Sequence, residues 1–91
     1  MAWQLSPLVA LHWRCWDDEF VVFDAGSGQT HQLPPITAAS LMMLELASAD
    51  IEELTSRVSD ELMLANYDQL SSIVSEAVHG LRVVGLIEFA S

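Results

Sequence analysis

The side chains best suited to chemistry in this sequence are three histidines and one cysteine. His12 and Cys15 lie in a stretch that predicts a β-strand, where residues three apart point to opposite faces, so they cannot share one metal ion without a bend. His31 and His79 are far apart in the sequence, and neither has a full set of Cys, Asp or Glu at ligand spacing around it. Such histidines are more often surface or hydrogen-bonding groups than general bases. The sequence therefore predicts no metal site.

Motifs for nucleophilic catalysis or phosphate binding are not found either. No serine lies in a Gly-x-Ser-x-Gly turn, and Gly26-Ser27-Gly28 is short and precedes a strand instead of a helix. The clustered carboxylates of residues 17–19 fit a hairpin turn, and those of residues 50–53 fit a solvated helix start that matches the helix dipole. We therefore predict a protein that is not an enzyme and needs no cofactor.

The charge balance excludes a further class of function. Three basic residues, all Arg, face thirteen acidic ones, which gives a net charge of −10. This field repels phosphate backbones, so nucleic acid is not an expected partner. A winged-helix DNA binder is disfavoured because its third helix would carry Arg82 alone against Asp68 and Glu76. A basic peptide or protein surface is compatible with the same field.

Length and composition predict one globular domain over residues 1–91. The chain has 91 residues, of which 52% are apolar and 18% charged. The lone Cys15 cannot form an internal disulfide, and the first residues lack the features of a signal peptide, so we expect a cytoplasmic protein. The uncharged stretch of residues 25–44 contains glycines, prolines and polar residues that hydrocarbon does not tolerate, so no membrane span is expected.

Three strands are expected before Pro34-Pro35, within a β-meander over residues 3–33. Residues 8–16 and 20–23 are rich in apolar and aromatic residues around an acidic turn. Residues 25–28 supply a glycine turn, and residues 29–33 form a short polar strand. Low apolar content and two closing prolines favour an edge position for this third strand, although the first strand is also a candidate edge.

Three helices are expected in the remainder, residues 35–89. Residues 36–47 are apolar on all sides, so this helix is either buried twice or binds something. The second helix opens at Ser48 or Asp50 with a capping box that includes Glu53. The third is capped by Asp68 and stops near Gly85, before an extended tail at residues 86–89. Its apolar residues recur at steps of three and four: Leu70, Ile73, Val74, Ala77, Leu81 and Val84.

A free strand edge beside an apolar helix suits peptide binding. An extended segment can add to the edge through main-chain hydrogen bonds while alternate side chains enter an apolar groove. The simpler alternative is that the apolar residues of the third helix are ordinary core.

Two stretches resemble a known family: residues 27–33, Ser-Gly-Gln-Thr-His-Gln-Leu, and residues 81–88, Leu-Arg-Val-Val-Gly-Leu-Ile-Glu. Over residues 3–89 the chain is similar to the PqqD-like peptide chaperones, in particular the branch associated with an HPr-kinase-related protein. The resemblance implies an α+β fold, a three-stranded antiparallel sheet followed by a three-helix winged-helix-like bundle, known as the RiPP recognition element.

The same resemblance implies a non-catalytic adaptor that captures a precursor or leader peptide as an added strand and presents it to a modifying enzyme, such as a radical SAM protein. The implied peptide-binding residues come from the third strand and the third helix: Gln29, Thr30, His31, Gln32, Leu33, Leu70, Ile73, Val74, Ala77 and Leu81. Basic residues that other members direct at acidic leaders are scarce here.

A second hypothesis is a structural or regulatory subunit of an HPr-kinase-related system. In that case the surplus apolar surface of Leu41, Met42 and Leu46 would meet another subunit, for example in a homodimer.

Overall fold

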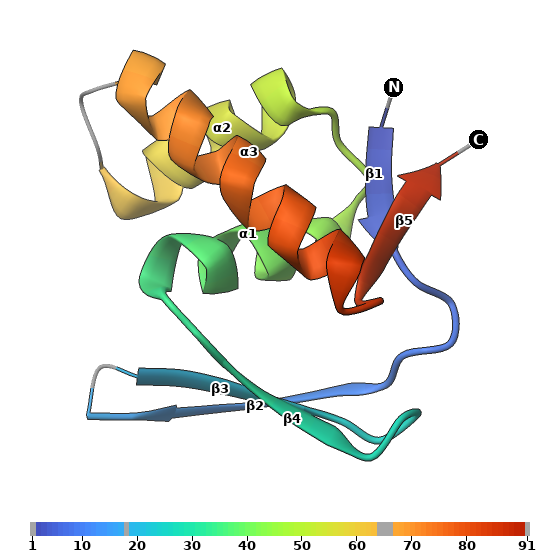
Figure 1. Ribbon diagram of the computed structural model, residues 1–91. Coiled ribbons are helices and arrows are strands. Elements are labelled where there is room, and N and C mark those ends of the chain that lie inside the picture. Colours follow the sequence, from blue (N-terminus) through green and yellow to red (C-terminus); the bar gives the residue numbers. More distant parts are fainter. Residues whose placement is uncertain (1, 18, 64–66, 91) are drawn as a thin grey trace.

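The chain folds into a layer of three helices above an antiparallel sheet (Figure 1). A computed structural model describes residues 2–17, 19–63 and 67–90. The elements follow the order β1 (Ala2–Leu5), β2 (Leu11–Trp16), β3 (Glu19–Asp24), β4 (Gln29–Leu33), α1 (Pro35–Leu46), α2 (Ile51–Leu62), α3 (Tyr67–Val83) and β5 (Ile87–Ala90). The predicted α+β class, with a three-stranded antiparallel sheet and three helices, is confirmed.

The expected meander is the sheet β2-β3-β4, with β3 in the centre. Leu11 to Trp16 pair with Asp24 to Glu19, and Phe20 to Asp24 pair with Leu33 to Gln29, all antiparallel. β4 is therefore an edge strand, as its polar sequence predicted, and β2 is the other edge. Of the predicted acidic turn between β2 and β3, Asp18 lies outside the described residues.

A second, two-stranded sheet joins the two ends of the chain. β1 pairs with β5 in antiparallel register, and Trp3 also bridges to Ala49 before α2. The rings of Trp3 and Phe89 stack at 3.9 Å, and the Arg82 guanidinium lies 4.8 Å from the centroid of the Phe89 ring. Residues 86–89 were predicted to be extended, but no strand was predicted at residues 2–5, which belong to this two-stranded sheet and not to the meander.

Local signals set the ends of α2 and α3. Asp50 caps α2, and its carboxylate accepts a hydrogen bond from the Glu53 N–H at 2.7 Å. α3 begins at Tyr67, so Asp68 lies within the first turn and not at the predicted capping position, where its charge still favours the helix dipole. At the other end Gly85 has φ +83°, and the Leu86 N–H donates to the Leu81 carbonyl, which is a Schellman ending.

The hydrophobic core lies mainly among the helices. The largest side chains with essentially no exposure include Leu41, Leu54, Val58, Val74 and Leu81. The three-stranded sheet contributes only Val22 at 0% exposure, and partly buried side chains of β2 and β4 pack around it. Because the sheet is covered mostly near its centre, the space beside the edge strand β4 is left open to solvent.

The buried carboxylate of Asp24 organises the hairpin turn between β3 and β4. Asp24 accepts hydrogen bonds from the N–H of Ala10 at 3.0 Å, the N–H of Gly26 at 2.9 Å and the hydroxyl of Ser27 at 2.8 Å. A Cβ on Gly26 would clash with the carbonyl oxygen of Leu8, so only glycine fits there. Asp24 therefore ties the start of β4 to the segment before β2.

This network predicts a specific acid sensitivity. The hydrogen bonds from Ala10 and then Ser27 lower the pKa of Asp24 below its ordinary 3.8. A lowered folded-state pKa stabilises the protein fully above pH 3.8, and that contribution is lost as the pH falls through the folded-state pKa. We expect urea unfolding of the wild type to lose this increment below pH 3.8, whereas Asp24→Asn is less stable at neutral pH and lacks that part of the decline. Parallel stability curves for the two proteins would contradict this role.

Candidate functional site: a groove beside an open strand

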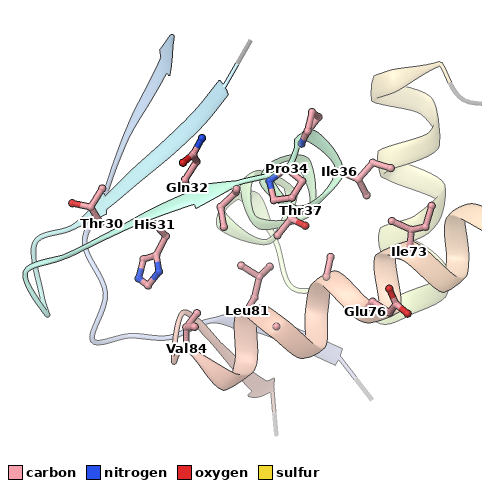
Figure 2. Close-up of a pocket in the computed structure, with 14 residues that line it drawn as sticks. Thr30, His31, Gln32, Pro34, Ile36, Thr37, Ile73, Glu76, Leu81 and Val84 are labelled. Atoms are coloured by element: carbon pink, nitrogen blue, oxygen red, sulfur yellow. The ribbon is translucent and has the colours of Figure 1, made fainter. Parts of the chain in front are cut away.

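An open groove of about 790 Å³ lies between β4 and α3. Its β side is formed by residues 30–33, and its floor and far wall by Ile73, Ala77, Gly80 and Leu81 of α3, with Val84 just beyond the helix. The link Pro34-Pro35 and the first turn of α1 close one end. Figure 2 shows the side chain of His31 pointing from β4 towards Leu81 and Val84, whereas the side chains of Thr30 and Gln32 point to the other face of the sheet.

Most of the predicted peptide-binding residues meet at this groove. Residues 30–33 and the side chains of Ile73, Ala77 and Leu81 line it. Leu70 and Val74 do not, since they are 3% and 0% exposed within the core cluster. Gln29 lies at the exposed start of β4, outside the lining.

Other lining residues were not among the predicted peptide-binding residues. They are Pro34, Pro35, Ile36, Thr37, Glu76, Gly80 and Val84. On α3 the signal was available, because neighbours among positions 73, 76, 77, 80 and 81 recur three or four residues apart and share one helix face. Glu76 and Gly80 were passed over because only apolar residues were counted on that face.

Along β3 the peptide groups of alternate residues point towards β2 and towards β4. The hydrogen bond of Ala25, the residue directly after β3, shows which residues point to which side. The Ala25 N–H donates to the Ala10 carbonyl, on the β2 side, at 2.9 Å. Since the peptide groups of successive strand residues point to alternate sides, those of Asp24 and Val22 point towards β4. The Gly28 N–H, which donates to the Asp24 carbonyl at 2.8 Å, agrees with this phase.

This phase identifies the backbone groups that β4 leaves open. The partners of Asp24 and Val22 on β4 are Gln29 and His31. By the same alternation, Thr30 and the next such residue, Gln32, direct their N–H and C=O away from β3. No other described strand pairs with β4, so these groups lie at an open edge. An added strand could form a short ladder there.

Two ionisable side chains, those of His31 and Glu76, belong to residues of the groove lining. Nε2 of His31 is buried and has no hydrogen-bond partner among the described residues. Buried polar atoms without a partner are uncommon in folded proteins. Glu76 is exposed on the α3 side, towards the Ile73 end of the groove (Figure 2). Besides apolar contact and the hydroxyl of Thr37, the groove therefore offers one imidazole and one carboxylate.

Metal-binding clusters are not found in the part of the chain that the structure describes. No group of three His, Cys, Asp or Glu there is arranged to hold a metal ion. His12 faces the outer side of the sheet with Phe23, its partner on β3, and the thiol of Cys15 is free and exposed. Within residues 2–17, 19–63 and 67–90 no helix has the length and apolar character to cross a membrane.

The fold has a counterpart of known structure. The chain matches TbiB1, solved in complex with the TbiA(beta) leader peptide, with a TM-score of 0.71 over 97% of this chain and 98% of that chain. The two sequences are 18% identical, so the likeness establishes a shared fold. No family model matches this sequence. No curated protein matches it either.

Proposed function

We propose that this protein is a non-catalytic peptide-binding adaptor, which captures an extended precursor or leader segment as an added strand on β4. The observation that carries the proposal is an open strand edge directly beside an apolar groove. The outward peptide groups of Thr30 and Gln32 supply main-chain hydrogen bonds, and the groove takes the alternate side chains of the guest. The fold shared with TbiB1, whose structure holds a leader peptide, supports the same assignment.

The refined site consists of two parts with separate tasks. Thr30, His31, Gln32 and Leu33 provide the edge, and Ile73, Ala77 and Leu81 provide apolar contact. Leu70 and Val74 stabilise α3 from within the core, because their side chains are buried. Gln29 anchors β4 to Asp24 on β3.

Presentation to a modifying enzyme requires a second surface that stays free when the groove is filled. The outer face of the sheet suits this need, because Trp16 and Phe23 are 72% and 41% exposed on the side away from the helices. A radical SAM or HPr-kinase-related enzyme, as the sequence resemblance implies, is the proposed partner there.

The alternative is a structural or regulatory subunit that self-associates. Leu46, at 79% exposure, favours such a contact, whereas Leu41 is fully buried in the core and cannot take part. Sedimentation at several protein concentrations separates the two: a concentration-dependent dimer disrupted by Leu46→Asp supports the subunit, and a monomer at all concentrations supports the adaptor.

Selection from a displayed library of random 12-residue peptides tests the adaptor directly. We expect a set of enriched peptides that compete with one another for one site and shift the backbone amide resonances of β4 and α3. A library that yields no binder, or binders that leave these resonances unchanged, would overturn the proposal.

A further inference from the structure

Gly80 occupies a position in the groove where the fold itself has no need of glycine. It lies inside α3, and glycine is among the least favourable residues in a helix interior. A Cβ placed on Gly80 would meet no atom within 4 Å, and Gly80 does not adopt a positive φ. Neither packing nor backbone conformation therefore explains it. Because Gly80 has no side chain and lines the groove between Ala77 and Val84, it makes the groove deeper at this position.

Glu76, one turn earlier on the same face, carries a charge that no cation of the described chain neutralises. The chain has three Arg and no Lys. Arg57 pairs with Glu53, and Arg82 lies over the aromatic rings of β1 and β5. Arg14 is on β2 and lines a separate hollow on the outer face of the sheet. The groove thus presents an uncompensated carboxylate in a protein of net charge −10.

The spacing of these two features matches that of an extended guest. Residues four apart on a helix are separated by about 6 Å along its axis. Side chains on one face of a strand repeat every two residues, or about 6.6 Å. Two successive inward side chains of an added strand can therefore lie opposite Glu76 and Gly80.

We propose that the groove selects an extended segment with the pattern basic-x-large apolar, or its reverse, in which Lys or Arg pairs with Glu76 and a bulky apolar side chain fills the hollow over Gly80. This inference rests on the proposed function and specifies its ligand. Gly80 sets the size of the apolar side chain that the groove accepts, and Glu76 sets the sign of the neighbouring charge. The order of the pattern depends on the direction in which the guest pairs with β4.

The test repeats the selection of random 12-residue displayed peptides on the wild type, Glu76→Lys, Gly80→Phe and Gly80→Ala. The wild type should enrich the basic-x-large apolar pattern, and Glu76→Lys should enrich Asp or Glu in place of the basic residue. Asp60→Lys, an equal change of charge on the exposed face of α2, is the control and should leave the pattern unchanged.

Gly80 gives a readout that separates ligand contact from stability. Gly80→Ala should raise Tm by about 4–8 °C, since alanine favours the helix, yet weaken binding of wild-type-selected peptides. Gly80→Phe should fold, because the position is open, and should weaken those peptides at least about tenfold by occupying the hollow.

The possible failures are distinguishable. Enriched peptides that shift β4 and α3 resonances but show no charge or size pattern, or that bind Gly80→Phe as tightly as the wild type, would overturn this inference and leave the adaptor function standing. Absence of any enriched peptide would overturn both.

Discussion

Replacing Ile73 by Asp is expected to abolish capture of extended peptides while the protein stays folded. Ile73 is 40% exposed and lines the groove, so a carboxylate there remains hydrated in the free protein. Bound to a peptide, the same carboxylate would be covered by apolar side chains and would replace favourable apolar contact with a desolvated charge. We expect a loss of at least about 100-fold in affinity, or about 2.7 kcal/mol.

Titration of library-selected peptides by calorimetry or fluorescence measures this effect. Ser75→Asp places the same charge on the same helix, at an exposed position outside the groove, and should bind like the wild type. Ile73→Val should retain most of the affinity. Wild-type affinity in Ile73→Asp would show that peptides bind elsewhere on the molecule.

The adjacent substitution, Val74→Asp, should have the opposite consequence and prevent stable folding. Val74 has 0% exposure and belongs to the core cluster shared by all three helices. Burial of an unpaired carboxylate costs more than about 3 kcal/mol, a large share of the about 5–15 kcal/mol that stabilises a typical domain. Urea unfolding followed by circular dichroism should show a strongly lowered midpoint or no cooperative transition, whereas Ser75→Asp unfolds like the wild type. A Val74→Asp protein of ordinary stability would mean that this face of α3 does not form the core.

The contrast between Ile73 and Val74 shows which features of α3 could be predicted from the sequence and which could not. The period of three and four along α3 placed residues 70–84 on a helix with one apolar side, and that was correct up to Val83, where the helix ends. The same period could not show which apolar residues on this side belong to the core and which line the groove. That division depends on how far β4 lies from α3, which is set by the hairpin turn at Asp24 and by the link Pro34-Pro35, not by the period itself.

The edge position of β4 could be predicted from the sequence for a different reason. Polar side chains on both faces and two prolines at the end are poor choices for a central strand, and the order β2-β3-β4 agrees. The pairing of β1 with β5 was not predicted, because four residues at each end of the chain carry almost no periodic signal. Their contact depends on long-range packing of Trp3 with Phe89.

Glu76 and Gly80 show a further limit of sequence patterns. Neither supports the helix through apolar burial, so a search for core residues passes over both. Their joint position on the groove became visible only when β4 was placed opposite them.

Amide hydrogen exchange along β4, measured by NMR with and without a library-selected peptide, tests the central claim most directly. In the free protein the N–H groups of Thr30 and Gln32 should exchange much faster than that of His31, which the phase of the ladder directs towards β3. On saturation with peptide, both should become strongly protected while His31 changes little. Thr30 and Gln32 amides that are already protected in the free protein, or that remain unprotected in the complex, would contradict peptide capture by an open strand edge.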